Sequence, residues 1–245
     1  MKSLKSKALL LLAITFGLVS WSPPNNESLI VGLNNTFRSS TGYLGIIGSD
    51  NFFDARSSLV VGTANTASYE SPSNDSTTTF SNSILSGTSN VVKNSASRCM
   101  ISGNGNSVEA NATVVSGTNN TLAGATVGTP TLNSVAMGGN NQIAAGHGWI
   151  LGYNNTVTGD YGVTLGYGNN VSGWRGHVLG TGLTTNQPES LALGKYNAPL
   201  VTNDVVVVGC GTATVPNTAL RITSDGGVIL GRAQGDISMG IYGGN

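Results

Sequence analysis

A short pattern of apolar and polar positions recurs along most of this chain. Each copy reads apolar-x-apolar-Gly-x-x-Asn-x-apolar, as in "VTLGYGNNV" at 163–171. Two intervals between copies are long, and each fits one repeat plus a polar excursion, at 68–82 and at 123–133. The anchoring glycines are Gly32, Gly48, Gly62, Gly87, Gly103, Gly117, Gly138, Gly152, Gly166, Gly180, Gly194 and Gly209, and their numbers differ successively by 16, 14, 25, 16, 14, 21, 14, 14, 14, 14 and 15.

The commonest of these intervals is too short for a pair of helices or for a propeller blade. It suits one coil of a β-solenoid that is made of two short strands and two turns. We therefore predict an all-β fold, a parallel β-roll or solenoid of about twelve such coils. Because side chains alternate along a strand, the residues one and three before each glycine lie on the same face. These pairs include Leu29 and Val31, Val135 and Met137, Val163 and Leu165, and Leu191 and Leu193.

The residue between each pair lies on the opposite face, and it is often apolar too, as at Ile30, Val60 and Ile150. A strand that is apolar on both faces is covered on both faces. A narrow solenoid has one interior, so we expect an identical chain to cover the second face, because most oligomers are symmetric homo-oligomers. The paired residues above are then the predicted core and subunit-packing residues. The strand after each asparagine carries one regular apolar residue, which suits a wall that faces water.

The repeated glycine and asparagine have an explanation in the backbone. A coil reverses direction twice within one repeat, so some positions need a positive φ, which glycine accepts freely and asparagine better than most residues. Asparagines in register can also hydrogen-bond to their copies or to the turn backbone. We expect these residues to be structural.

Composition narrows the function classes. Only 9% of the residues are charged, the formal net charge is zero and no basic run follows the first seven residues. Nucleic acid is therefore not an expected partner, because its phosphates require a stripe of Lys and Arg.

Residues 1–22 carry a basic start, an apolar run and small residues, the order of a secretory signal peptide. The alternative is a buried N-terminal strand or helix. No later stretch has the length of a transmembrane helix, so we expect none in the mature chain.

The units "SVAMGGNNQIAAG" (134–146) and "SLALGKYNAP" (190–199) resemble the head repeats of trimeric autotransporter adhesins, the YadA-like head. The resemblance covers about 28–203, and it implies a left-handed parallel β-roll and a homotrimer whose inner strands pack at the centre. Residues 191–231 are similar to the segment that closes such heads in some bacterial secreted proteins and phage fibres. Members of the family continue into a coiled-coil stalk and a β-barrel anchor. The residues up to Asn245 carry neither pattern, so attachment to an outer membrane is not expected.

The expected organisation has three parts. A signal peptide at 1–22 precedes a YadA-like β-roll head at 23–203, and a closing coil with a hairpin follows at 204–245. The hairpin turns at Asp225-Gly226. We expect it to cap the last open coil.

The sequence contains no clear catalytic, metal-binding or phosphate-binding motif. His147 and His177 have no companions at metal-ligand spacing. The acids are scattered, no "GxSxG" occurs, and glycine-rich stretches lack the strand-loop-helix context of a phosphate site. Cys99 and Cys210 form no disulfide framework, and each occupies a position that suits a small apolar residue. We therefore predict no enzyme activity, no catalytic residue, no metal and no cofactor.

Four aromatic residues cluster in successive coils: Trp149, Tyr153, Tyr167 and Trp174. Aromatic side chains one coil apart can stack into a ladder along the roll. Such a ladder serves either packing or ligand binding, and both readings stay open.

The sequence favours a secreted or surface-displayed trimeric adhesin-like head that binds host, matrix or neighbouring cell surfaces through a protein or glycan receptor. The alternative is a structural component, such as a phage or virion fibre head or a building block of an extracellular layer or filament.

Overall fold

The structure, a computed structural model, describes residues 29–37, 44–53, 55–68, 80–93, 96–123, 131–231 and 237–238. It is all-β, with no helix in these ranges, and forms a stacked parallel β-solenoid of about 11 turns. The predicted fold class is confirmed, with about one turn fewer than expected. The chain divides into two compact units, Met1–Thr118 and Asn119–Asn245.

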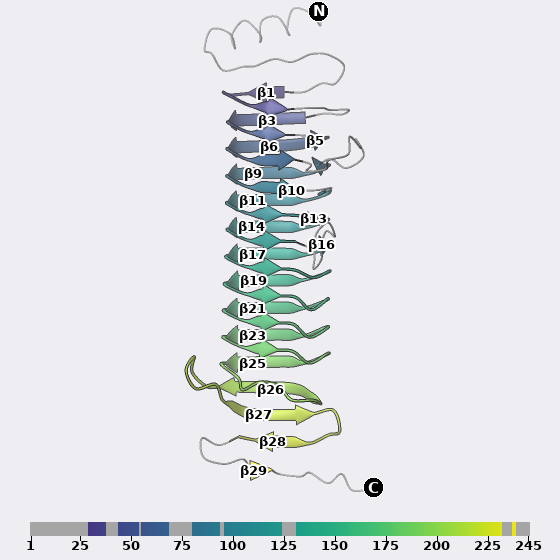
Figure 1. The fold of residues 1–245 in the computed structure, drawn as a ribbon, viewed down its shortest axis with the longest axis vertical. Helices are drawn as coiled ribbons and strands as arrows, with labels where there is room; N and C mark the ends of the chain where they lie inside the picture. Colours follow the sequence, from purple (N-terminus) through teal and green to yellow (C-terminus); the bar gives the residue numbers. More distant parts are fainter. Residues whose placement is uncertain are drawn as a thin grey trace, which may run out of the picture. The chain divides into compact units, whose positions relative to one another are not determined.

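Unit 1 stacks one long and one short strand per coil (Figure 1). Its long strands pair in parallel in the order β1 (Leu29–Val31), β3 (Leu44–Ser49), β6 (Ser58–Thr63), β9 (Ile84–Thr88), β11 (Met100–Asn104) and β14 (Val114–Thr118). Its short strands follow in the order β2 (Thr36–Phe37), β4 (Phe52–Phe53), β7 (Thr66–Ser68), β10 (Val91–Lys93) and β12 (Ser107–Val108). β5 (Ala55–Arg56) and β8 (Phe80–Ser81) form a small parallel pair, and β13 covers Ala110–Asn111.

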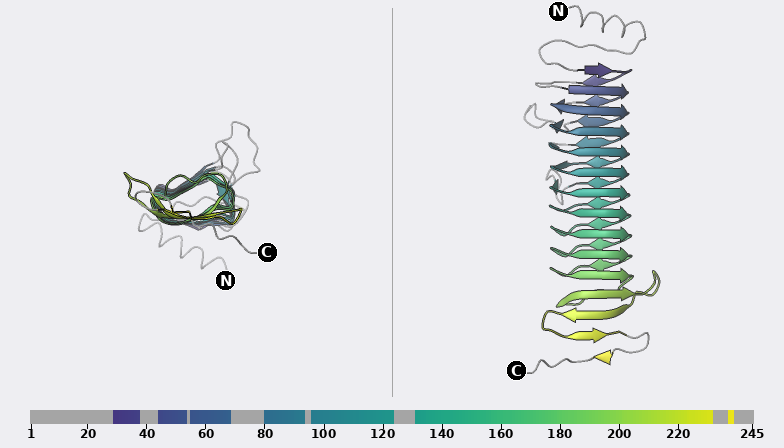
Figure 2. Two further views of the ribbon diagram at one scale, coloured as in Figure 1. Left: turned by 90° about the horizontal axis from the view of Figure 1, so that it is seen from below. Right: turned by 180° about the vertical axis from the view of Figure 1, so that it is seen from behind.

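Unit 2 repeats this arrangement with greater regularity (Figure 2). Its long strands are β17 (Val135–Gly139), β19 (Trp149–Tyr153), β21 (Val163–Tyr167), β23 (His177–Thr181), β25 (Leu191–Lys195) and β26 (Asp204–Cys210). Its short strands are β15 (Thr121–Leu122), β18 (Gln142–Ile143), β20 (Thr156–Val157), β22 (Asn170–Val171) and β24 (Thr184–Thr185), and β16 covers Thr131–Leu132. We call the two series of strands the long sheet and the short sheet.

The interior of each coil is narrow, because each strand contributes one central residue to it. In unit 2 the long sheet contributes the residue two before each glycine, and Ile150 on β19 is fully buried. The short sheet contributes the second residue after the asparagine, such as Val157, which is also fully buried. The same positions are filled in unit 1 by Ile46, Val60, Leu85, Ile101 and Val115 from the long sheet and by Phe53, Ala67, Val92 and Val108 from the short sheet.

The anchoring glycine starts the first turn of each coil, which runs from that glycine to the residue three positions later. Eleven of the twelve anchoring glycines, Gly32 to Gly194, have positive φ, with 131° at Gly166 as an example. A Cβ on Gly152 would lie 1.9 Å from the carbonyl oxygen of Gly166 in the next coil. Only glycine permits this backbone angle and this close approach together.

The asparagine that ends the first turn binds that same carbonyl group. The side-chain Nδ2 of Asn155 donates to the Gly166 oxygen at 2.8 Å and to Oδ1 of Asn141, one coil earlier, at 3.1 Å. The Oδ1 of Asn155 in turn accepts from Nδ2 of Asn169 at 3.0 Å. Unit 1 has the same ladder from Asn35 through Asn51, Asn65 and Asn90 to Asn106. The predicted structural role of glycine and asparagine is confirmed.

The twelfth glycine does not begin another coil. Gly209 lies in β26, and β26 pairs antiparallel with β27 (Thr218–Thr223). β27 pairs antiparallel with β28 (Val228–Leu230), so the expected hairpin across Asp225-Gly226 is present, and β29 (Ile237–Ser238) follows β28. This change of direction explains why the structure has about 11 turns and not one more.

Three sequence expectations fall outside the described residues. The signal peptide at 1–22 lies there, as do most of the two excursions, at 69–79 and 124–130. Within the ranges that are described, no helix has the length and apolar character needed to cross a membrane.

The glycine geometry yields a first prediction. Gly166→Ala places a Cβ 1.9 Å from the Gly180 oxygen at a φ of 131°, so we expect the free energy of unfolding to fall by more than about 3 kcal/mol. Gly168→Ala is the matched control. Gly168 has a φ of 64° and nothing within 4 Å of an added Cβ, so it should lose only about 1 kcal/mol. Chemical denaturation measures both, and equal losses would contradict the role of the glycine.

The interior yields a second prediction. The Thr164 hydroxyl is fully buried and has no hydrogen-bond partner, so Thr164→Val should raise the free energy of unfolding by about 1 kcal/mol. Thr185 is equally buried, but its hydroxyl is hydrogen-bonded to the Ser190 hydroxyl. Thr185→Val should therefore lower stability by about 1 kcal/mol. Two shifts of the same sign in thermal unfolding would refute this account.

Candidate functional site

The outer face of the long sheet is apolar in unit 2. Met137, Trp149, Leu151, Leu165 and Leu179 are 38–52% exposed in the isolated chain. Val135, Val163, Leu191 and Leu193 are half-buried on the same face. The predicted subunit-packing residues of this unit thus all point away from the solenoid interior, because the residue between each pair fills it.

The outer face of the long sheet in unit 1 carries both apolar side chains and serines. Leu29 is 52% exposed and Val31 is half-buried. Further exposed apolar side chains are Ile47, Leu59, Ile84 and Met100. Serines occupy the position one before the glycine in three consecutive coils, at Ser86, Ser102 and Ser116.

The outer face of the short sheet in unit 2 is polar. Its outward positions carry Thr121, Gln142, Thr156, Asn170 and Thr184, one per strand. This wall suits contact with water, so the two faces of the same unit differ sharply in chemistry.

The four aromatic residues singled out in the sequence do not form one stripe. Trp149 lies on the outer face of the long sheet, whereas Tyr153 and Tyr167 lie in the first turns of two successive coils. The rings of Tyr153 and Tyr167 stack with centroids 6.1 Å apart and planes within 6°. Their hydroxyls accept hydrogen bonds from Asn140 and Asn154 of the preceding coils. Trp174 lies in a different turn, between β22 and β23.

Sequence reasoning missed a second stack, in the turn that precedes each long strand. We call this the second turn. The residue that lies five positions before the next anchoring glycine is in this turn, and it has positive φ in successive coils. In unit 2 this position carries Asn133 and then, in four successive coils, His147, Tyr161, Arg175 and Glu189, with φ of 61°, 59°, 53° and 54° for these four. The signal in the sequence is their regular spacing, which equals the interval between the glycines, because they share no residue type.

The side chains of this second-turn stack contact one another. The rings of His147 and Tyr161 are parallel within 5°, with centroids 4.6 Å apart. The Arg175 guanidinium carbon lies 3.9 Å from the centroid of Trp174 and 5.9 Å from that of Tyr161. Arg175 also forms an ion pair of 3.2 Å with Glu189. The stack is therefore continuous across four coils.

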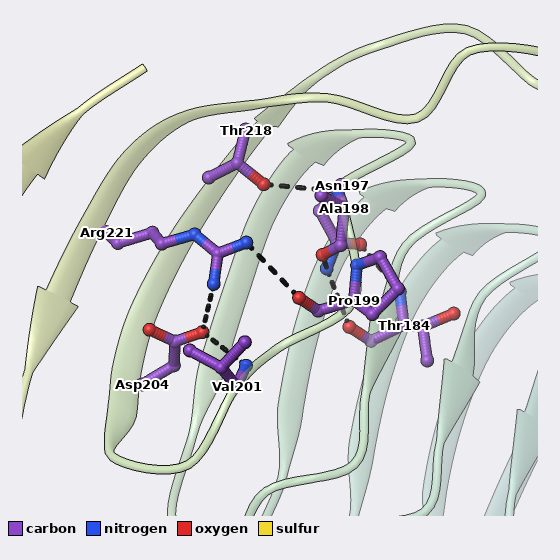
Figure 3. Close-up of polar contacts among 8 residues, drawn as sticks. All are labelled: Thr184, Asn197, Ala198, Pro199, Val201, Asp204, Thr218 and Arg221. Atoms are coloured by element: carbon purple, nitrogen blue, oxygen red, sulfur yellow. Dashed lines mark hydrogen bonds and ion pairs between the residues drawn. The ribbon is translucent and has the colours of Figure 1, made fainter. Parts of the chain in front are cut away.

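A polar cluster holds the start of the C-terminal hairpin in place (Figure 3). The Oδ2 atom of Asp204 accepts from Arg221 and from the backbone N–H of Val201, both at 2.7 Å. Arg221 also donates to the carbonyl oxygen of Pro199 at 3.2 Å. The Asp204 side chain is fully buried, and its Oδ1 has no hydrogen-bond partner. The cluster joins β26 to β27, so it is structural.

One carboxyl group in the hairpin turn has a lowered pKa. The Thr223 hydroxyl and the backbone N–H of Gly227 donate to Asp225, and these bonds hold the pKa of that carboxyl below its usual value. Asp225 is exposed, so the bonds fix the shape of the turn and do not form a catalytic centre.

The remaining candidate groups lie apart. Within the described ranges, no three His, Cys, Asp or Glu residues come together as metal ligands. His177 lies on the outer face of the long sheet, away from His147 in its turn. Cys99 is buried, as its position in the repeat suggests, whereas Cys210 is exposed. The expectation for Cys210 was wrong because the position after the glycine faces outward, as Tyr153 and Tyr167 also do.

Comparison of the sequence with protein-family models finds no match, and comparison with curated proteins finds no similar sequence.

The buried ion pair yields a third prediction. Arg221→Met leaves the Asp204 carboxylate buried without its cation, so the free energy of unfolding should fall by about 3–5 kcal/mol. Arg175→Met is the matched control, because the Arg175 and Glu189 side chains are 52% and 64% exposed. It removes an exposed ion pair and an exposed contact with the Trp174 ring, so it should change stability by less than about 1 kcal/mol. Hydrogen exchange should show the loss first at the amides of β26 and β27, and an unchanged rate there would contradict the assignment.

Proposed function

We propose that this chain self-associates as a homotrimer through the outer face of its long sheet and acts as a secreted or surface-displayed adhesive head. The observation that carries the proposal is the apolar outer face, with Trp149, Leu165 and Leu179 among its exposed residues. Soluble monomers rarely expose large contiguous apolar patches, and such patches mark interaction sites.

An identical chain is the partner that fits this face best. Apart from His177, the face carries apolar side chains in coil after coil of unit 2, so a second copy laid alongside offers a matching row of side chains at the same spacing. Most soluble oligomers are homo-oligomers with closed symmetry. Three chains follow from the resemblance of 134–146 and 190–199 to trimeric adhesin heads.

The role in adhesion is supported by the exposed side-chain stacks on both turns of unit 2. A trimer presents each stack three times, and multivalent contacts sum to a binding strength that one copy does not reach. The receptor is an extracellular protein or a glycan on a host, matrix or neighbouring cell surface.

A structural role is the second candidate, as a fibre head or as a building block of an extracellular layer or filament. The asparagine ladder favours it, because continuous hydrogen bonding along successive coils gives a stiff scaffold. In that case the assembly would form without any affinity for cell surfaces or matrix.

Self-association yields a fourth prediction. Sedimentation equilibrium should give three times the mass of one chain, and Val163→Asp or Leu191→Asp should give single chains, because a buried carboxylate without a partner is strongly unfavourable. Asn170→Asp is the matched control, since Asn170 is exposed on the polar outer face of the short sheet, and it should leave the assembly intact. A folded single chain of the unmodified protein would refute the proposal.

A further inference from the structure

The second-turn stack of unit 2 contains residues that its backbone does not favour. The left-handed region is accessible to glycine and asparagine and costs free energy for most other residues. At the left-handed position of the first turns, unit 2 uses Asn119, Asn140, Asn154, Gly168 and Gly182 in succession, and a tyrosine, Tyr196, only in the next coil. Four successive second turns instead carry a histidine, a tyrosine, an arginine and a glutamate. Strained residues of this kind cluster at functional sites.

Burial does not account for this choice. Tyr161 is 47% exposed and Trp174 is 43% exposed, and the ion pair of Arg175 with Glu189 is exposed as well. These side chains therefore contribute little to the core, and an exposed ion pair contributes little to stability. Asparagine, as at Asn133 in the same position, would form the turn at lower cost.

The backbone holds the stack in a fixed geometry. The N–H of Arg175 donates to the Asp160 oxygen and the N–H of Glu189 to the Trp174 oxygen, both at 2.8 Å. The N–H of Tyr161 donates to the Gly146 oxygen at 3.1 Å. Each coil therefore places one planar side chain at the strand spacing of about 4.8 Å, and the stack is organised before any ligand arrives.

We propose that the second-turn stack, His147, Tyr161, Arg175 and Glu189 with Trp174, is a binding stripe for a linear, uncharged polysaccharide. The faces of the His147 and Tyr161 rings cover each other, so the stripe offers a sugar chain the edges of these rings and their polar groups. The imidazole, phenol, guanidinium and carboxylate groups hydrogen-bond to sugar hydroxyl groups. A row of one side chain per coil matches an extended chain molecule. A folded protein partner would require a broad patch of about 800 Å².

The charge of the stripe selects an uncharged ligand. Arg175 is paired with Glu189, and the Asp160 carboxylate lies beside the stack, where it accepts from the N–H of Gly146 at 2.8 Å. An anionic polymer would meet these two carboxylates and find no unpaired arginine among the residues of the stack. This inference names the ligand of the adhesive role proposed above and rests on that role for its multivalency, whereas the stripe itself lies within one chain.

Affinity electrophoresis in gels that contain hydroxyethylcellulose, glucomannan or neutral arabinoxylan tests the proposal, with heparin and gelatin as anionic and protein probes. At least one neutral polysaccharide should retard the unmodified protein. The double variant Tyr161→Asn, Arg175→Asn should weaken this binding at least tenfold, as should Trp174→Ala. Asn170→Ala, on the polar outer face of the short sheet and away from both stacks, is the control and should bind as the unmodified protein does.

Thermal unfolding separates binding from packing. Asparagine suits the left-handed backbone, so the double variant should unfold at the same temperature or a higher one. A lower unfolding temperature would show that the stack serves packing and would overturn the proposal. The proposal would also be overturned if only heparin or gelatin retarded the protein, or if no polymer did. Equal retardation of the double variant and the unmodified protein would overturn it as well. Sedimentation of the same samples shows whether the protein self-associates. If it sediments as single chains that still bind the polysaccharide weakly, the proposed self-association is wrong and the binding stripe stands.

Discussion

The interaction on which this fold depends joins the glycine of one coil to the asparagine of its neighbour. The left-handed glycine brings its carbonyl group so close to the preceding coil that no side chain fits between them, with 1.9 Å from the Gly166 oxygen to a Cβ built on Gly152. The amide of Asn155 binds the same oxygen at 2.8 Å. Neither residue works alone, because the glycine exposes a carbonyl group that needs a donor and the asparagine buries an amide that needs acceptors.

The narrow interior follows from this geometry. With two strands and two tight turns per coil, one residue of each strand reaches the centre, and few large side chains fit there. With so small an interior, the hydrogen bonds that run from coil to coil, such as that from Asn155 to the Gly166 oxygen, carry much of the stability. The apolar outer face of the long sheet is where the proposed contacts between chains would form, whereas the polar short sheet has the chemistry of a surface that stays in water.

The sequence predicted the features that repeat and missed those that do not. Glycine and asparagine at fixed spacing predicted the solenoid, and alternation around Val163 and Leu165 predicted which side chains face away from its interior. The pairing of Asp204 with Arg221 had no such signal, because it occurs once and joins residues that no pattern relates. The second-turn stack escaped notice because its members share a backbone conformation and not a residue type. Gly209 fits the repeat in sequence, but β26 is paired on one side by an antiparallel strand, which the pattern alone does not reveal.

The two turns of each coil also differ in how much change they tolerate. The first turn runs from Gly32 to Asn35 and has the same length after every later anchoring glycine up to Gly194, and it ends in asparagine in all these coils except at Leu183. All variation in the length of the repeat, including both long excursions, falls at the second turn or next to it. The ladder of asparagine amides thus keeps the first turns in register. The second turns, at the opposite edge of each coil, can vary in sequence and length without loss of that register. A foreign peptide grafted at that edge would be displayed at a chosen height along the stack of coils, which makes the protein a molecular scaffold with evenly spaced attachment points.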